Sequence, residues 1–252
     1  MSYLSNYCRN KFFGSLLGME TFPKPKIYVG FSTTIPVDLE ESVTEPTAAD
    51  YNRVLYSNWK ISGRDVSNNK TITWYTRSDW GTLVYFLLWD APVEGNLLGY
   101  GALPAPVAVG NSKVLSFKKG DLQLRFVPAT ITNYLTDRFL EHLFGDVALT
   151  AVNTYVGLSY TNPGPSGVPT TPVSPDYHDI PFLGWEVTDD SRLVNIERIS
   201  FTPTRDWGIL PYLFIRDADN RVLFYSAFIT PVVANLYSPV YIEPTFLTIV
   251  FD

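Results

Sequence analysis

Short runs of apolar, β-branched and aromatic residues recur along the whole chain, and glycine, proline, asparagine or aspartate separates them. Such runs are typical of β-strands bounded by turns. The pattern predicts strands over residues 26–31, 71–75, 81–90, 97–103, 114–117 and 122–127, and again over 153–159, 196–201, 208–216, 222–228 and 246–251. The polar run from Asp217 to Asn220 predicts a hairpin turn between two of these strands.

Two segments instead repeat apolar residues at helical spacing. In the first segment Ser2 and Ser5 are candidate N-caps, and in the second the candidates are Thr132 and Asn133. Gly145 is well placed to end the second helix. The apolar positions are Leu4, Phe12, Phe13, Leu16 and Leu17 in the first segment, and Leu135, Phe139, Leu140, Leu143 and Phe144 in the second.

The two halves of the chain share short motifs in the same order, at offsets of 125 to 131 residues. The matching segments are 3–6 with 134–137, 28–32 with 155–159, 79–81 with 206–208, and 122–126 with 247–251. This colinear series predicts a tandem duplication, with a first domain over residues 1–127 and a second over 128–252. Each domain is expected to be mainly β, a β-sandwich or jelly roll of six to eight strands preceded by a short α-helix.

The sharpest shared motif is Asp-Trp-Gly, which occurs as Asp79-Trp80-Gly81 and as Asp206-Trp207-Gly208. In an enzyme the aspartate would be a base or a nucleophile, but no second acid or histidine stands at a fixed spacing from it. In a structural turn, glycine supplies backbone freedom, tryptophan fills the core and aspartate bonds nearby amides. The motif therefore predicts two structural turns, each leading into a strand.

The remaining candidates for chemistry also favour structural interpretations. Cys8 is the only cysteine, so an intrachain disulfide is excluded, and with two histidines a zinc site is not expected. The run from Asp217 to Asn220 fits a turn better than a calcium loop. His142 is expected to lie on a helix surface. The sequence thus predicts no catalytic residue, no metal site and no cofactor.

Aromatic residues are unusually frequent, and their role has two interpretations. Trp59, Trp74, Trp89 and Trp185 could form a platform on which sugars stack. They could equally be core and interface anchors, which is favoured because most of them lie within apolar strands. Two long, proline-rich loops, over residues 33–50 and 161–176, are of the kind that often makes contacts.

Charge is distributed unevenly between the halves. Residues 1–127 carry 13 basic and 11 acidic side chains, a net charge of +2, whereas residues 128–252 carry 6 and 14, a net charge of −8. Neither half has a basic patch suited to nucleic acid, and no segment resembles a signal peptide or a membrane span. The split predicts a homo-oligomeric ring or lattice in which unlike domains of neighbouring copies meet. Alternatively, the acidic half only maintains solubility.

The first half contains Tyr28-Val29-Gly30-Phe31-Ser32, Tyr51-Asn52-Arg53-Val54, Asp79-Trp80-Gly81, the stretch from Asp90 to Leu103, and Gly120-Asp121-Leu122-Gln123-Leu124. In this order the motifs resemble small tailed-bacteriophage virion proteins, often labelled tail fibre or minor tail proteins. The second half departs from the pattern, because Tyr225-Ser226-Ala227-Phe228 replaces Tyr100-Gly101-Ala102-Leu103.

The resemblance implies a non-enzymatic structural component of a virion, made in the cytoplasm of a bacterial host. We expect it on the tail, baseplate or fibre-attachment side, in contact with other virion proteins and with no nucleic acid or membrane. One alternative is a capsid decoration protein. Another is a carbohydrate-binding module that recognises a host-surface glycan.

Overall fold

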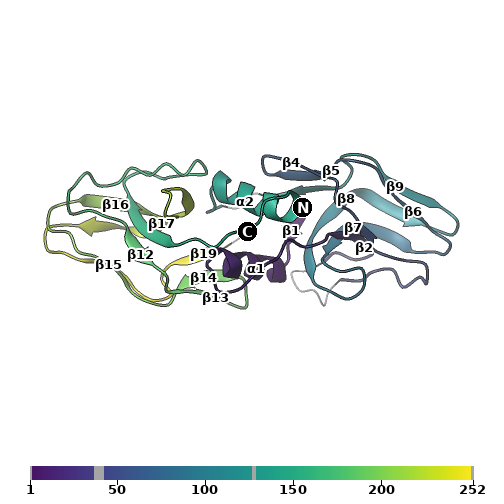
Figure 1. The fold of residues 1–252 in the computed structure, drawn as a ribbon, viewed down its shortest axis with the longest axis horizontal. Coiled ribbons are helices and arrows are strands. Elements are labelled where there is room, and N and C mark those ends of the chain that lie inside the picture. The colour runs from purple at the N-terminus through teal and green to yellow at the C-terminus, as the bar shows by residue number, and fades with distance from the viewer. Residues whose placement is uncertain (1, 37–42, 127–128, 251–252) are drawn as a thin grey trace. The chain divides into compact units, whose positions relative to one another are not determined.

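The computed structural model describes residues 2–36, 43–126 and 129–250 (Figure 1). Within them the chain is mainly β, as the sequence predicts, and two helices accompany the strands. Strands in both main sheets pair antiparallel, which suits connections by short turns. The predicted junction at residues 127 and 128 lies outside the described part of the chain.

The chain forms two compact units, and each takes a short segment from outside its own half of the sequence. Unit 1 contains most of residues 2–126 together with Leu140–Ala148. Unit 2 contains most of residues 129–250 together with Phe12–Thr21. A cut at the predicted junction would therefore leave each unit without part of its chain.

The main sheet of unit 1 has the strand order β1-β8-β7-β2-β3. Its strands are β1 (Ser2–Leu4), β2 (Tyr28–Ser32), β3 (Val54–Leu55), β7 (Gly81–Trp89) and β8 (Leu97–Val109). A smaller sheet has the order β10-β5-β4, and β6 pairs with β9. These strands are β4 (Trp59–Ser62), β5 (Asp65–Asn68), β6 (Ile72–Tyr75), β9 (Val114–Phe117) and β10 (Gln123–Arg125).

Unit 2 has a similar layout, with a main sheet in the order β12-β11-β16-β17. Its strands are β11 (Thr154–Ser159), β12 (Ile180–Phe182), β16 (Gly208–Arg216) and β17 (Val222–Ala234). A smaller sheet has the order β13-β14-β19, and β15 pairs with β18. These strands are β13 (Trp185–Val187), β14 (Arg192–Asn195), β15 (Ile199–Phe201), β18 (Val240–Ile242) and β19 (Thr248–Val250).

The core of unit 1 joins its main sheet to the β6–β9 pair, as in a sandwich. Phe31 on β2 is fully buried, and its ring centroid lies 4.8 Å from that of Trp74 on β6 and 5.4 Å from that of Phe117 on β9. Burial alternates along β6 and β9, so one face of this pair supplies the core, whereas β2 is buried on both faces. The sandwich-type fold expected from the strand pattern is confirmed.

The long hairpin of each unit carries the same irregularity. The pairs on either side of it are Leu83–Val107 and Tyr85–Ala102 in unit 1, and Leu210–Val232 and Tyr212–Ala227 in unit 2. Residues 103–106 therefore lie opposite the single residue 84, and residues 228–231 opposite residue 211, so each ladder bulges by three extra residues. The bulges place mostly exposed side chains in the middle of β8 and β17.

Both helices begin at residues expected as caps. The helices are α1 (Asn6–Leu16) and α2 (Asn133–Phe144). The N–H of Cys8 donates to Oγ of Ser5 at 3.1 Å, and the N–H of Leu135 donates to Oγ1 of Thr132 at 3.4 Å. Ser5 and Thr132 are thus the N-caps, and α2 ends directly before Gly145, as predicted.

The C-terminal part of α1, from Phe12 onward, packs in the core of unit 2. In unit 2, Phe12 is fully buried and its ring centroid lies 4.5 Å from that of Phe139. Phe13 is also fully buried, and its ring centroid lies 6.1 Å from that of Phe224 on β17. Two large side chains from the N-terminal helix therefore complete the core of unit 2.

The sequence match between residues 3–6 and 134–137 is wrong as a structural correspondence. Tyr3 and Leu4 lie in β1, whereas Tyr134 and Leu135 lie inside α2. The sequence pattern placed Leu4 on the apolar face of a helix. Leu4 instead lies in a strand, so this expectation is wrong. The segment before an N-cap is extended and the one after it is helical, so the two Tyr-Leu pairs share letters but not structure.

His142 does not lie on a helix surface, which corrects the sequence expectation. Its side chain is 1% exposed, and its ring centroid lies 5.2 Å from that of Phe22 in unit 1. Burial lowers the pKa of His142, because desolvation disfavours the charged imidazolium. The expectation failed because Phe22 lies on the chain far from α2, and helical spacing alone cannot show that it covers this face.

Nine strands follow each helix in the described residues, against the six to eight expected. In unit 1 the strands that the sequence missed include β4 and β5, whose polar residues hide the usual apolar pattern. No helix in the described part of the chain combines the length and the apolar character needed to cross a membrane.

Candidate functional site

The two Asp-Trp-Gly motifs form tight turns with the same geometry. Trp80 is 3% exposed and Trp207 is 5% exposed, so both side chains belong to the core. The N–H of Gly81 donates to Oδ1 of Asp79 at 2.8 Å, and that of Gly208 donates to Oδ1 of Asp206 at 2.9 Å. Gly81 and Gly208 have φ values of 78° and 80°, a region in which only glycine is free of strain.

Each turn is held by a second aspartate that the sequence analysis missed. The indole N–H of Trp80 donates to Asp50 at 3.3 Å, and that of Trp207 donates to Asp176 at 3.2 Å. Asp50 also accepts from Ser78, and Asp176 also accepts from Thr204. The signal was present in the sequence, because an Asp-Tyr pair ends the long loop in both halves.

Acid should destabilise unit 1 through Asp50. The backbone N–H of Arg77, followed by the hydroxyl of Ser78, lowers the pKa of Asp50 from 3.8 to about 2. Because the folded pKa is depressed, the stabilisation is complete above about pH 4 and is lost as the pH falls through about 2. Denaturation curves of the wild type and of Asp50→Asn should therefore differ at neutral pH and converge in strong acid. An undiminished difference in strong acid would contradict this role of the carboxylate.

The tyrosine that follows each of these aspartates joins the turn to the main sheet. The N–H of Phe31 on β2 donates to the hydroxyl of Tyr51 at 2.9 Å, and the N–H of Leu158 on β11 donates to that of Tyr177 at 2.8 Å. Each tyrosine ring meets the tryptophan of its turn edge to face, with centroids 5.1 Å apart. Burial raises the pKa of both tyrosines, so the phenols stay protonated.

In unit 1 an ion pair completes this cluster. The hydroxyl of Tyr51 donates to Glu45, and Nε of Arg53 lies 3.1 Å from the same carboxylate. The guanidinium of Arg53 lies 3.7 Å above the ring of Trp89 and donates to the carbonyl of Ala91 at 3.1 Å. Arg53 therefore binds the long loop to the end of the β7–β8 hairpin.

Unit 2 builds the same cluster from different sequence positions. The hydroxyl of Tyr177 donates to Asp179 at 2.9 Å, and this carboxylate pairs with Nε of Arg216. The guanidinium lies 4.4 Å above the ring of Tyr155 and donates to the carbonyl of Asp217 at 3.0 Å. Arg216 comes from β16, whereas the arginine of unit 1 follows the loop, so no motif in the sequence links the two.

Replacing Gly157 with alanine should destabilise unit 2 by about 1–3 kcal/mol. A Cβ at this position would overlap the ring of Phe214 and lie 2.5 Å from Oδ1 of Asp179. Phe214 is fully enclosed, so its ring cannot move aside. Urea denaturation measures the loss. Gly110→Ala is the matched control, because its Cβ would meet nothing closer than the end of Lys113 at 4.0 Å. Equal curves for the two variants would contradict the close packing.

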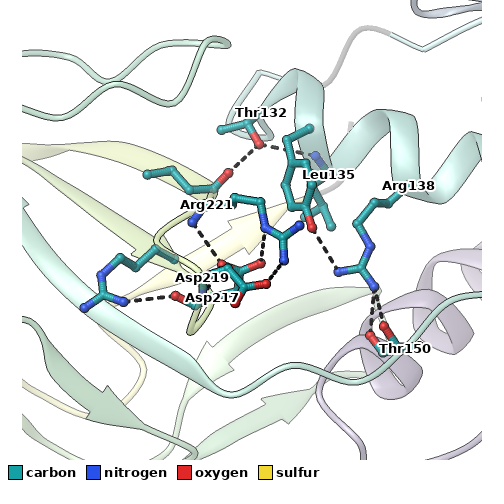
Figure 2. A network of polar contacts seen from close by, with 10 residues as sticks. Thr132, Leu135, Arg138, Thr150, Asp217, Asp219 and Arg221 are labelled. Atoms are coloured by element: carbon teal, nitrogen blue, oxygen red, sulfur yellow. Dashed lines mark hydrogen bonds and ion pairs between the residues drawn. The ribbon is translucent and has the colours of Figure 1, made fainter.

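A second polar network anchors the start of α2 in unit 2 (Figure 2). Oγ1 of Thr132 donates to the carbonyl of Val222 at 2.7 Å, beside the hairpin turn. In that turn the backbone N–H of Arg221 donates to the buried Asp217 at 2.9 Å, and its Nε pairs with the same carboxylate at 3.0 Å. The guanidinium of Arg221 also lies 4.8 Å above the ring of Tyr134. Asp217 thus holds a hairpin turn, as predicted.

The candidate side chains serve structural bonds rather than an open site. Trp74, Trp89 and Trp185 are buried, as the core interpretation predicted. Trp59 is half-buried and packs edge to face on Tyr56. No group of histidine, cysteine and acidic side chains that could hold a metal ion occurs among the described residues. The arrangement holds the ends of two long loops rigidly against two sheets.

The comparison with known protein families agrees with the resemblance found in the sequence. The family model described as "Podophage GP4 fiber I protein gp80" matches residues 3–125, just under half of the chain. The matched segment contains the Trp80 turn and the Glu45–Arg53 ion pair. No curated protein gave a significant match. Residues 3–125 are thus similar to a family of podophage fibre proteins, in agreement with the resemblance that the sequence motifs indicated.

Proposed function

We propose that this protein is a non-enzymatic structural component of the virion, on the tail, baseplate or fibre-attachment side, and that it acts through protein–protein contacts. The observation that carries the proposal is the match of residues 3–125 to a phage fibre protein. This match supports a structural role in a phage tail or fibre. Our proposal goes beyond this match in two respects. It states that the protein is not an enzyme, and that it lies on the tail, baseplate or fibre-attachment side of the particle.

The bonding of the acidic side chains supports a structural role. Asp50 and Asp176 accept hydrogen bonds from the tryptophan turns, and Glu45 and Asp179 pair with arginines. A general base must be within reach of a substrate proton, whereas these carboxylates already receive protein donors. Their bonds instead give the loops fixed ends, which is what a contact surface on a particle needs.

Two buried asparagines support the proposal that domains 1–127 and 128–252 are copies of one fold. Asn68 and Asn195 are both fully buried at the end of equivalent strands, β5 and β14. In each case the side-chain amide donates to two carbonyls and its oxygen accepts one backbone N–H. The partners are Lys70, Lys118 and Leu122 for Asn68, and Glu197, Glu243 and Leu247 for Asn195.

The partners in this proposal are other virion proteins and further copies of the chain, arranged in a ring or lattice. The charge split of +2 against −8 between the halves supports contacts between unlike domains. Three of the four tryptophans of the expected sugar platform are buried, which supports protein–protein contacts over the glycan-binding alternative.

The test is to locate the protein in purified particles. We expect a fixed copy number by quantitative mass spectrometry, and gold-labelled antibody at the tail rather than over the head. Glycan-array binding by the isolated chain, with the protein absent from particles, would contradict the proposal. Uniform labelling of the head would instead support the capsid decoration alternative.

A further inference from the structure

At one end of unit 2, exposed apolar side chains gather around the Trp207 turn. The side chains are Tyr160, Ile209, Val233, Leu236 and Tyr237, here called the apolar end. Ile209 pairs directly with Val233 across β16 and β17, and the hydroxyl of Tyr160 donates to the carbonyl of Trp207 at 2.6 Å. The N–H of Trp207 donates to the carbonyl of Ala234, just before Leu236, at 2.8 Å. These bonds bring Tyr160, Ile209 and Val233 together at the turn, and Leu236 and Tyr237 follow Ala234 by two and three residues.

Unit 1 has the same backbone at this end but different side chains. Thr82 pairs with Ala108, as Ile209 pairs with Val233. The residues of unit 1 that correspond to the apolar end are Thr33, Thr82, Ala108, Asn111 and Ser112. All five are polar or small, so the shared fold does not require apolar side chains here. The apolar end is therefore a property that only unit 2 carries.

The conformation of Tyr237 also suggests a use for this surface. Tyr237 has a φ of 58° and is 80% exposed. A positive φ strains a bulky residue, and such outliers concentrate where they serve a function. Ser112 has a φ of 53° at the corresponding turn, where a small polar residue fills the same role. The shared turn thus fixes the conformation, and unit 2 presents on it an exposed tyrosine, a residue type enriched among interface anchors.

Unit 1 carries a smaller apolar surface of its own, with cations beside it. Tyr75 and Val114 are exposed and pair directly across β6 and β9. Arg77 follows Tyr75 by two residues, and Lys113 directly precedes Val114. Both cations are exposed. We call these four residues the cationic ribbon. The corresponding residues of unit 2 are Thr202, Pro239, Thr204 and Ser238, so unit 2 has no such ribbon.

We propose that the apolar end of one copy docks on the cationic ribbon of a second copy. The proposal rests on the structural role proposed above and names the surfaces of its homo-oligomer. Apolar side chains lose contact with water on both partners, which supplies the attraction. The ribbon carries two cations and lies in the half of the chain with net charge +2, whereas the apolar end lies in the half with net charge −8, so contacts between unlike units are favoured over contacts between like units. Because the two surfaces differ, the contact is heterologous and can continue from copy to copy.

The two units provide matched replacements that their common fold already tolerates. Variant A carries Ile209→Thr, Leu236→Asn and Tyr237→Ser, the residues of unit 1 at those positions. Variant B carries Tyr75→Thr, Arg77→Thr and Lys113→Ser, the residues of unit 2. The control carries Val173→Thr and Ile229→Thr, which replace fully exposed apolar side chains outside both surfaces. Circular dichroism and melting curves establish that each variant is folded.

Sedimentation velocity of the full chain between about 1 and 100 µM measures self-association. We expect the wild type and the control to associate, and variants A and B each to associate at least about 10-fold more weakly. Mixing A with B should restore a species of two chains only, because A keeps its ribbon and B keeps its apolar end. This mixing result distinguishes a head-to-tail contact from a symmetric one.

Three outcomes would overturn the inference. In the first, the wild type is monomeric throughout this range, and the apolar end would then belong to another virion protein. In the second, variant A associates like the wild type. In the third, variants A and B each lose self-association, but mixing them does not produce the species of two chains. Detection of the wild type in purified particles remains a separate readout, so the virion role can stand when this contact fails.

Discussion

Replacing Trp207 with alanine should lower the free energy of unfolding by about 3–5 kcal/mol. The indole is 5% exposed, so its removal leaves a cavity in the core of unit 2. The variant also loses the edge-to-face contact with Tyr177 and the hydrogen bond to Asp176. Without the indole N–H, the carboxylate of Asp176 has one hydrogen-bond donor fewer, beside the turn that leads into β16.

Urea denaturation followed by circular dichroism measures this effect. Trp207→Phe should cost less than alanine, because it keeps most of the ring volume and loses the indole N–H. Phe246→Ala is the matched control, since that aromatic side chain is exposed and its removal should change the stability by less than about 0.5 kcal/mol. An unchanged transition in Trp207→Ala, with a lost binding activity, would mean that the tryptophan serves a surface site.

Replacing Asp179 with alanine should cost about 3–5 kcal/mol, because it leaves the guanidinium of Arg216 without its counter-ion. The two side chains are 11% and 18% exposed, so water cannot replace the missing partner well. The hydroxyl of Tyr177 loses its acceptor in the same variant. The loss should exceed that of any exposed ion pair, such as Arg198–Glu243 on the surface of unit 2.

A double variant separates the missing charge partner from the missing packing. Asp179→Asn with Arg216→Met removes both charges and keeps an acceptor for Tyr177, so it should recover much of the loss. Glu243→Ala is the control and should fall within about 1 kcal/mol of the wild type. If the double variant is no more stable than Asp179→Ala, the unpaired charge is not the cause.

The strands that the sequence predicted best are those bounded by glycine or by polar turn residues. The strand over 208–216 has the predicted bounds, between the glycine of the Trp207 turn and the hairpin at Asp217. The strand over 114–117 likewise matches. In β8 and β17 the prediction stopped early, at residues 103 and 228, where each strand enters its bulge. A bulge keeps the strand extended while it disturbs the alternation on which the prediction depends.

The candidate site was predictable only where its parts are neighbours in the chain. Asp79 and Gly81 bond across two residues, so their motif shows the turn. Asp50 bonds to Trp80 across 30 residues, and no spacing rule connects them. The arginine of the ion pair follows the loop in unit 1 but lies on β16 in unit 2. Both units thus have the same spatial arrangement of tyrosine, carboxylate and arginine. Because the arginines come from different positions, aligning the two halves of the sequence cannot reveal it.

The sequence by itself determined the β class, the two tryptophan turns and the positions of both helices, because local periodicity and turn chemistry depend on neighbouring residues. The tertiary structure decided the rest. It assigned Phe12–Thr21 to unit 2 and Leu140–Ala148 to unit 1, buried His142, and chose the partners of Asp50 and Asp176. These choices depend on which apolar faces and which unpaired donors meet after the chain has folded back, and such contacts leave no regular spacing in the sequence.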